Sequence, residues 1–202
     1  PVASQGGAIN QHGCVLLCAA DRIIIGCGSY DLGSAVKEMK APVSYTNSNL
    51  NWPLRMVALS NNASNVAVAG HCGLAVCNTS RNVQKWRLFG STAEEKSMHV
   101  RCFFWCSNTV LAVLCNVAGQ GEQLYLFPHD HVAMSAVLHT QALPTGCVPS
   151  VAGYCGLTGT VVLWTAAKES LPARLDVCHL SLDFSYEQGV AFNVPVPGQT
   201  AQ

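Results

Sequence analysis

The chain has 202 residues, of which 50% are hydrophobic, and its 11 basic and 11 acidic side chains give a formal net charge of zero. A neutral chain offers no electrostatic basis for binding nucleic acid or an anionic membrane, so composition excludes both as partners. Charged residues make up 11% of the chain, whereas an ordinary soluble domain has about 25%. This shortage indicates either a surface that a partner covers or poor solubility.

Two apolar stretches are long enough to be considered as membrane spans, which need about 20 mainly apolar residues. Asp21 and Arg22 interrupt the first stretch, and Ser107 to Thr109 breaks the second one as a hairpin turn would. We therefore expect no direct membrane span. The 11 cysteines contain no C-x-x-C pair, and cysteines scattered in apolar runs are usually small buried residues, so we expect free thiols in a reducing, cytosolic environment.

The first fifty residues predict two strands and a connector. Residues 14–20 and 23–27 are apolar runs separated by a turn, and the second run is rich in β-branched residues. Residues 28–50 are mostly polar and are expected to connect two structural units. Within them, residues 35–40 could form one helical turn that Pro42 ends.

The stretch from Asn51 to Gly90 alternates short apolar runs with turn residues. Residues 66–70 carry small apolar side chains on both faces, which is typical of a strand that is covered on both sides. Turn residues flank this strand and predict hairpin connections. The stretch has the length of one blade of a β-propeller, a four-stranded unit of roughly 40–45 residues.

A repeat supports the propeller interpretation. Aligning Ile23 with Val66, and Val66 with Val110, gives offsets of 43 and 44 residues, which lie within the propeller period of about 40–45. After Gly90, residues 92–96 predict a charged loop or a single helical turn with acids near its start.

The second half of the chain continues with strands and then becomes less regular. Strands are predicted at 98–106, 110–117 and 122–127. Residues 131–167 contain no formally charged residue and many prolines and glycines, and only 160–164 form a clear strand there. Residues 171–184 are expected to form a pair of strands.

These patterns predict an all-β fold, namely a partial WD-type β-propeller of about four to five blades. The expected domain covers residues 13–193, with 51–127 as its clearest part, between a loose segment at 1–12 and a disordered tail at 194–202. Since a closed ring has about 4–8 blades, and the chain starts at Pro1, we expect a fragment or a shortened gene product.

The central stretch also resembles a known family. The runs Asn51–Arg55, Val66–Gly70, Gly73–Ala75 and above all Lys85–Gly90 are similar to the propeller region of the ribosome-control (Ric) family, and the similarity continues weakly to His131. This resemblance covers about a third of the chain. It implies a part of the large subunit of the Ric–Rgp complex, a guanine-nucleotide exchange factor for a Golgi Rab GTPase in retrograde vesicle traffic.

The resemblance implies several functional properties. The partners would be an Rgp-type subunit and a Golgi Rab GTPase, at a cytoplasmic, peripheral Golgi location. The chain would be a non-catalytic regulatory scaffold without a cofactor, because the matching residues are structural. The cations that flank the matching blade are candidates for partner contacts, although solvation of strand ends is the simpler role: Arg55, Arg81, Lys85 and Arg87. Trp52, Trp86 and Trp105 are expected to pack the blades.

Two functions of other classes remain as alternatives. One is a thiol hydrolase that uses Cys72 or Cys155 with a histidine, because a cysteine nucleophile needs a nearby base; His71 is adjacent to Cys72 in sequence, but neighbours in a turn point apart. The other is a generic propeller adaptor unrelated to Golgi traffic.

The sequence also contains residues that could bind zinc. The best set of ligands is Cys102 and Cys106 with His129 and His131. On a strand the two cysteines share one face with Phe104 between them, so packing explains them better. The lone G-x-G at Gly119 lacks the helix and lysine of a phosphate loop.

Overall fold

The computed structural model of the chain describes most of its residues. The described ranges are 14–27, 35–46, 51–81, 83–143, 146–155, 157–165 and 173–179. The segments expected to be loose, at 1–12 and 194–202, lie outside these ranges.

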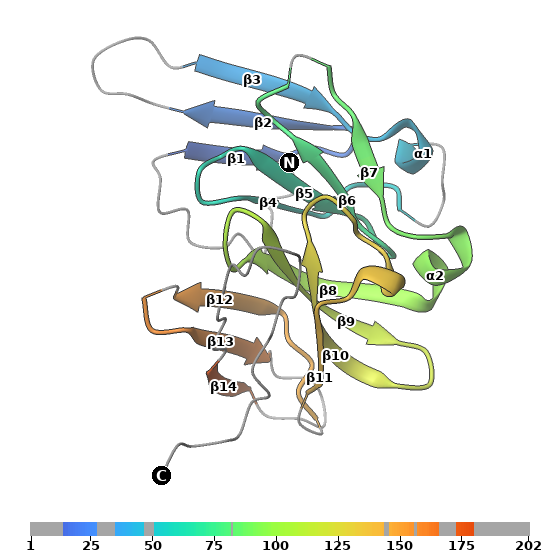
Figure 1. The fold of residues 1–202 in the computed structure, drawn as a ribbon, viewed down its shortest axis with the longest axis vertical. Helices are drawn as coiled ribbons and strands as arrows, with labels where there is room; N and C mark the ends of the chain where they lie inside the picture. The colour runs from blue at the N-terminus through green and yellow to red at the C-terminus, as the bar shows by residue number, and fades with distance from the viewer. Residues whose placement is uncertain are drawn as a thin grey trace, which may run out of the picture.

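The described residues form four antiparallel sheets, each built from strands that are consecutive in the chain (Figure 1). The first two sheets are β1 (Cys14–Cys18), β2 (Arg22–Cys27) and β3 (Ala35–Lys40), and β4 (Met56–Leu59), β5 (Asn65–Ala69), β6 (Ala75–Asn78) and β7 (Trp86–Leu88). The other two are β8 (Met98–Trp105), β9 (Val110–Val117), β10 (Gly121–Pro128) and β11 (His139–Ala142), and β12 (Val151–Cys155), β13 (Thr160–Thr165) and β14 (Arg174–His179). The helical pieces are short: α1 (Val43–Thr46), α2 (Thr92–Ser97) and the 3-10 turn η1 (Met134–Ala136).

The four sheets follow one another face to face, and their first strands are neighbours. β1 contacts β4, β4 contacts β8, and β8 contacts β12. Successive sheets whose innermost strands lie side by side are the arrangement of propeller blades. The predicted all-β, partial propeller is therefore confirmed, with four blades in the part of the chain that the structure describes.

The predicted repeat aligns the correct strands with one another, but one of its three aligned residues lies on the opposite face of its sheet. Ile23, Val66 and Val110 each lie at the first or second position of the second strand in their sheets. Ile23 and Val110 face the sheet that follows, whereas Val66 faces the sheet that precedes. The structural counterpart is Ala67, because a shift of one residue reverses the facing of every side chain in a strand.

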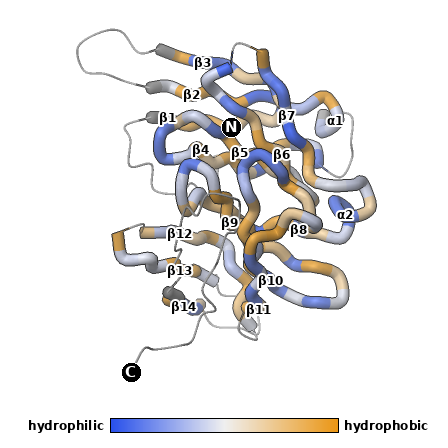
Figure 2. The backbone as a smooth tube through the Cα atoms, viewed as in Figure 1, coloured by the Kyte–Doolittle hydropathy of each residue, from blue (hydrophilic) through white to orange (hydrophobic). Residues whose placement is uncertain are grey.

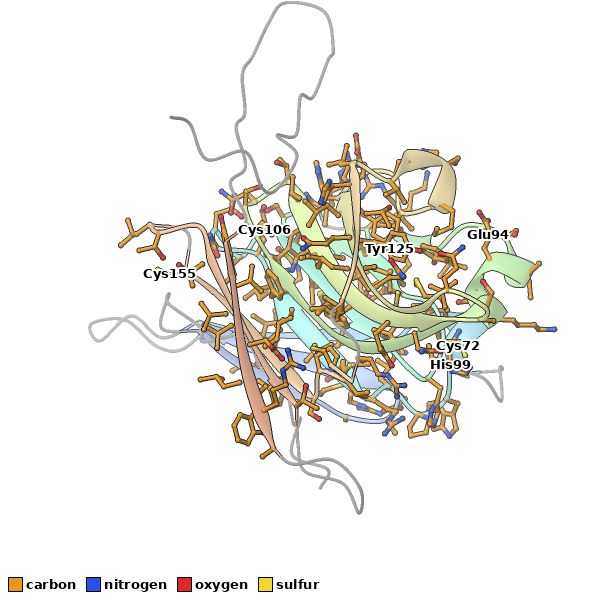
Figure 3. The ribbon with its side chains drawn as sticks, turned by 90° about the horizontal axis from the view of Figure 1, so that it is seen from below. Cys72, Glu94, His99, Cys106, Tyr125 and Cys155 are labelled. Atoms are coloured by element: carbon orange, nitrogen blue, oxygen red, sulfur yellow. The ribbon has the colours of Figure 1, made fainter. Side chains whose placement is uncertain are left out.

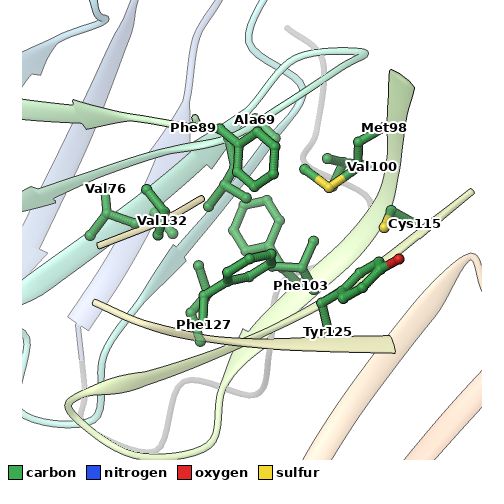
Figure 4. Packing of buried hydrophobic residues seen from close by; sticks show 14 of the residues in the cluster. Ala69, Val76, Phe89, Met98, Val100, Phe103, Cys115, Tyr125, Phe127 and Val132 are labelled. Carbon is green, nitrogen blue, oxygen red and sulfur yellow. The ribbon is translucent and has the colours of Figure 1, made fainter. Parts of the chain in front are cut away.

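The largest core lies between the second and third sheets (Figure 4). There the Phe89 ring meets the Phe127 ring edge-on, with a centroid separation of 5.6 Å and an interplanar angle of 86°, which is a favourable geometry for aromatic rings. β5 is buried along its whole length, as its small apolar residues on both faces predicted. The apolar strands β5 and β9 lie inside the stack of sheets, as the hydropathy colouring in Figure 2 shows.

One element differs from its predicted type. Residues 35–40, which could have formed a helical turn, are strand β3 and pair antiparallel with β2. Met39 lies opposite Ile23, and both side chains are fully buried against the second sheet. Pairing and burial therefore override a local pattern that was ambiguous between helix and strand. The helical turn predicted after Gly90 is confirmed as α2, which a capping box between Ser91 and Glu94 begins.

The uncharged segment contains more strands than predicted. The strand predicted at 160–164 is confirmed as β13, but β11 and β12 were missed because they are short and only partly buried. Of the pair of strands expected at 171–184, β14 is described and it pairs with β13, while residues 180–184 lie outside the described ranges.

Candidate interaction surface

Strand β3 of the first sheet lies beside the second sheet, next to β7 and the segment that precedes β7. The Trp86 indole Nε1 donates to the Lys40 carbonyl at 3.1 Å, and Gln84 Nε2 donates to the Glu38 carbonyl at 3.4 Å. The Lys37 ammonium also donates to the Thr79 carbonyl across the same boundary. Three hydrogen bonds therefore join the two sheets at the edge of the molecule.

Four basic residues and one tryptophan lie along this boundary, which we call the β3–β7 rim: Lys37, Lys40, Lys85, Arg87 and Trp86. The three lysines are exposed, and Trp86 and Arg87 are half-buried. Burial raises the pKa of the neighbouring Cys77, and the charges of Lys37 and Arg87 partly oppose this rise. The rim thus combines an indole with several positive charges.

The acidic side chain on this part of β3 has its own partner. Glu38 Oε1 accepts from Arg22 Nη1 at 2.8 Å, and Arg22 also pairs with Asp21. The structure thus groups cations on the rim that sequence reasoning missed, namely Lys37 and Lys40. They were missed because the segment around β3 was interpreted as a connector.

The four predicted contact cations do not form one patch. Lys85 and Arg87 lie on the rim, and Arg81 lies in the same β6–β7 connection. Arg55 comes just before β4, and the start of β4 pairs with the end of β5. The β6–β7 connection lies at the other end of β5, because the last residue of β6 pairs with the first residue of β5. Arg55 is therefore at the opposite end of the blade, where its Nη1 lies 2.9 Å from Nδ1 of His71.

The three tryptophans named above occupy different environments. Trp105 is buried and its indole Nε1 donates to the Ala58 carbonyl of the second sheet at 3.2 Å. Trp86 is half-buried against the core between the first and second sheets. Trp52 is 40% exposed and precedes a cis peptide bond to Pro53.

A polar junction connects the second sheet to the helix α2. Asn51 Nδ2 donates to the Glu95 carboxylate at 2.8 Å, and Asn51 Oδ1 accepts from the Cys72 backbone N–H at 3.1 Å. Gly70 permits this approach, because a Cβ at that position would lie 2.2 Å from the Asn51 carbonyl oxygen. Burial raises the pKa of Glu95, and the hydrogen bond from Asn51 partly opposes this rise.

The junction contains a cysteine and a histidine in contact. Cys72 Sγ lies 3.5 Å from Nδ1 of His99, which comes from the third sheet (Figure 3). However, Cys72 is only 2% exposed, and both burial and the nearby Glu95 carboxylate raise the pKa of its thiol. A catalytic cysteine needs the opposite shift, so this pair does not favour the hydrolase.

Cys155 lies on the other side of the molecule from this pair, at the end of β12 and next to the turn that leads to β13 (Figure 3). The Thr158 hydroxyl lowers the pKa of the Cys155 thiol, with help from the backbone N–H groups of Thr158 and Leu157. Cys155 is therefore a partly exposed thiol with a lowered pKa, and it lies on the other side of the molecule from His99.

The candidate zinc ligands do not come together in the structure. Cys102, Phe104 and Cys106 lie together in the core between the third and fourth sheets, as their alternation predicted. Burial raises the pKa of Cys102 to about 12, which opposes the deprotonation that metal binding requires. His129 and His131 follow β10, and across the described ranges no group of three or more His, Cys, Asp or Glu side chains is arranged to hold a metal ion.

In the part of the chain that the structure describes, no helix has the length and hydrophobicity needed to cross a bilayer.

These features define a β-propeller protein with a basic rim and no catalytic arrangement among its described cysteines and histidines. The model of the RIC1 second beta propeller domain matches residues 21–167, and the chain belongs to that family. The predicted resemblance to the Ric family is thus confirmed.

Curated relatives agree with this assignment. The chain is 29% identical over 103 residues to the guanine nucleotide exchange factor subunit RIC1 of Mus musculus, which covers 50% of this chain and 7% of that protein. It is 33% identical over 107 residues to the corresponding subunit ric1 of Schizosaccharomyces pombe, and this match covers 48% of this chain and 10% of that protein. A Caenorhabditis elegans exchange factor subunit, R06F6.8, is 30% identical over 115 residues, and this match covers 55% of this chain and 7% of that protein. The aligned region is therefore a small part of each relative.

Solved structures with similar folds are more distant in sequence. Kluyveromyces lactis Hsv2p is 13% identical, with a TM-score of 0.48, covering 86% of this chain and 60% of that one. The β-propeller domain of the Trilobed protease from Pyrococcus furiosus is 10% identical, with a TM-score of 0.43, and this match covers 81% of this chain and 53% of that one.

Proposed function

We propose that this chain is a protein-interaction scaffold within the large subunit of a guanine-nucleotide exchange factor for a Golgi Rab GTPase. The observation that supports the proposal is the family match over residues 21–167, together with relatives that are exchange factor subunits. The proposed setting is the cytoplasmic side of the Golgi, in retrograde vesicle traffic. The proposed propeller domain covers residues 13–193.

The role proposed for this chain is binding rather than chemistry. An exchange factor stabilises the nucleotide-free GTPase by displacing its magnesium and phosphate contacts, and this requires no covalent step. We therefore propose that the chain alone does not exchange nucleotide and needs its partner subunit for activity.

The β3–β7 rim is the surface that we propose for the Rgp-type partner subunit. Binding energy in protein interfaces concentrates in a few residues, among which Trp and Arg are enriched. Trp86 and Arg87 are adjacent there, half-buried, and flanked by exposed lysines. A partner with an acidic patch would complement this charge and gain association rate as well as specificity.

The experiment that tests the function combines capture and exchange. The full chain is immobilised and presented with the Rgp-type subunit and the Rab, and release of a fluorescent nucleotide from the Rab is measured in parallel. We expect capture of the partner subunit without release by this chain alone.

Two other outcomes would change the assignment. Release by the isolated chain would show a functional surface for exchange on this propeller. Failure to capture either protein, with a chain whose circular dichroism shows a folded β-protein, would contradict the Golgi assignment and favour a generic propeller adaptor.

A further inference from the structure

The second and third sheets bring three basic side chains together at the end of the second blade that lies opposite the β6–β7 connection. Arg55 precedes β4, His71 lies between β5 and β6, and His99 belongs to β8. All three side chains are exposed. They lie at the boundary of the two inner sheets of the described stack, because β4 contacts β1 on one side and β8 on the other.

Backbone contacts fix the positions of these three residues. The Arg55 N–H donates to the Ala69 carbonyl at 2.9 Å, and the His71 carbonyl accepts from the Val100 N–H at 3.2 Å. The residue after His71 forms an isolated antiparallel bridge with His99. The packing of two blades, rather than the reach of flexible side chains, therefore holds the basic groups near one another.

Arg55 and His71 form a hydrogen bond whose direction follows from their chemistry. Nη1 of Arg55 lies 2.9 Å from Nδ1 of His71 and 3.4 Å from its Nε2. A guanidinium group only donates, so Nδ1 of His71 accepts and carries no proton in this arrangement. A histidine side chain ordinarily takes up its second proton near pH 6.5, and both of its nitrogens are then donors. Protonation of His71 therefore ends this hydrogen bond and leaves two positive charges facing each other.

The elements around His71 carry these other charged or titratable side chains: Arg55, Cys72, Glu95, Lys96 and His99. The acid in this set, Glu95, already accepts a hydrogen bond from Asn51 at 2.8 Å. Cys72 is buried, and its thiol contacts the His99 ring. A protonated His71 therefore stands among positive charges that a bound anion would neutralise.

We propose that Arg55 and His71 together bind a carboxylate in an acidic segment of a partner protein, and that His71 takes up one proton on binding. A carboxylate accepts from the guanidinium and from the protonated imidazole at once, and such charge-assisted hydrogen bonds are stronger than neutral ones. The carboxylate takes over the acceptor role that Nδ1 of His71 has in the described arrangement. This site is separate from the β3–β7 rim, so it does not depend on the partner proposed for the rim.

Proton uptake makes the affinity of this site depend on pH. Because the complex holds the proton of His71 more tightly than the free chain does, protonation and binding strengthen each other. The affinity should therefore rise as pH falls toward about 6, where carboxylates with an ordinary pKa of about 4 remain ionised. A site made of arginine and lysine alone would keep the same affinity over this range, since neither side chain titrates there.

The test uses the full chain and a peptide of six glutamates that carries a pH-insensitive dye, whose fluorescence anisotropy reports binding. We expect binding about fourfold tighter near pH 6 than near pH 7.5, the effect of one histidine proton held about tenfold more tightly in the complex. His71→Gln should remove this pH dependence. Arg55→Gln should weaken binding by about tenfold at both pH values, because one charge-assisted hydrogen bond is lost.

His131→Gln is the matched control. His131 is an exposed histidine just after β10, whose last residue pairs with Val110 at the start of β9, whereas His99 pairs with Asn116 near the end of β9. His131→Gln should therefore keep both the affinity and the pH dependence of the wild type. Circular dichroism checks that each variant is folded, which we expect because the replaced side chains are all exposed.

The proposal is overturned if the peptide does not bind, if it binds equally well at the two pH values, or if His131→Gln removes the pH dependence as His71→Gln does. Inorganic phosphate, added as a competitor, distinguishes the kind of anion. Tighter binding of phosphate than of the peptide would assign the site to a phosphate group and would also overturn the proposal.

Discussion

At the scale of single residues, the cysteines show how surroundings set the acidity of a thiol. Burial raises the pKa of Cys102 and of Cys115 to about 12, because a thiolate in the core would lack water. Cys155 has the opposite shift, since the Thr158 hydroxyl and nearby backbone N–H groups stabilise its thiolate. Reactivity should therefore differ sharply between thiols that the sequence alone treats alike.

This contrast predicts the order of alkylation. We expect a thiol reagent to label Cys155 before the buried cysteines at neutral pH, and to reach Cys102 and Cys115 only after the chain is unfolded. Mass spectrometry of labelled peptides, with and without denaturant, measures this order. Thr158→Val should slow the labelling of Cys155 and leave the buried cysteines unchanged. Equal labelling of Cys102 and Cys155 in the folded chain would contradict the described burial.

The neighbouring acids Glu94 and Glu95 should affect stability in opposite directions as pH changes. Burial raises the pKa of Glu95, so the folded state binds its proton more tightly than the unfolded state does. The free energy of unfolding therefore loses this contribution as pH rises above the ordinary carboxyl value of about 4.5. We expect Glu95→Gln to gain stability relative to the wild type over that rise, in urea denaturation series at several pH values.

Glu94 provides the control. The backbone N–H and the side chain of Ser91 lower the pKa of Glu94, so its contribution is present above about 4.5 and is lost as pH falls. Glu94→Gln should therefore lose stability relative to the wild type as pH rises, which is the opposite of Glu95→Gln. The same pH trend for both variants would refute the assignment of the two environments.

The contact between Cys72 and His99 was beyond sequence reasoning. The sequence suggested the adjacent His71, which instead lies beside Arg55. His99 reaches Cys72 because an isolated bridge joins the two residues across the boundary between the second and third sheets. Such a contact depends on how two blades pack, and no local pattern encodes it.

At the scale of elements, two tryptophans join neighbouring sheets through their indole N–H groups. Trp105 bonds to the second sheet from inside the core, and Trp86 bonds to the first sheet from its edge. The bonds are alike in length, so burial is the main difference between the two sites. The energetic effect of each ring should follow the apolar area that it removes from water.

Substitution of these rings tests that difference. We expect Trp105→Ala to lower the free energy of unfolding by about 3–5 kcal/mol, the usual range for emptying a large aromatic site. Trp86→Ala should lower it by about 2 kcal/mol, because only part of the ring is buried. Trp105→Phe should still lose about 1–3 kcal/mol, since the Ala58 carbonyl is left buried without its donor. Urea denaturation measures all three, and a larger effect at Trp86 than at Trp105 would contradict the described core.

The elements that sequence reasoning located well are those with long apolar runs. Residues 98–106, 110–117 and 122–127 became β8, β9 and β10 with ends shifted by at most one residue. By contrast, β3 mixes Val36 and Met39 with three charged residues, and only its pairing with β2 makes it a strand. Short, half-exposed strands such as β11, with the sequence HTQA, lack the alternating apolar residues that a sequence pattern can reveal.

At the scale of the whole molecule, the blades and the rim have separate roles. The repeated apolar faces stack the four described sheets on one another. The β3–β7 rim lies instead along the boundary of the first and second sheets. Charge substitutions on the rim can therefore alter the binding of a partner subunit without changing the apolar faces between the sheets.

The candidate site was only partly accessible from the sequence. The run from Lys85 to Gly90 marked the correct part of the chain, and Arg87 and Lys85 do lie on the rim. Arg55 lies at the other end of the blade because strand register, rather than nearness in sequence, decides which residues share an edge. Lys37 and Lys40 join the rim from a different blade.

The most direct test of the proposed scaffold is the affinity of the Rgp-type subunit for this chain and for two of its charge variants. If the rim binds the partner, Lys85→Glu should weaken binding by about tenfold or more, because it places a negative charge among the contacts. Lys96→Glu, which changes another exposed cation on α2 away from the rim, should bind within about twofold of the wild type, as surface charges outside an interface do. Titration calorimetry of the folded proteins gives both values. Equal affinity of Lys85→Glu and the wild type, or no binding by any of them, would contradict the account.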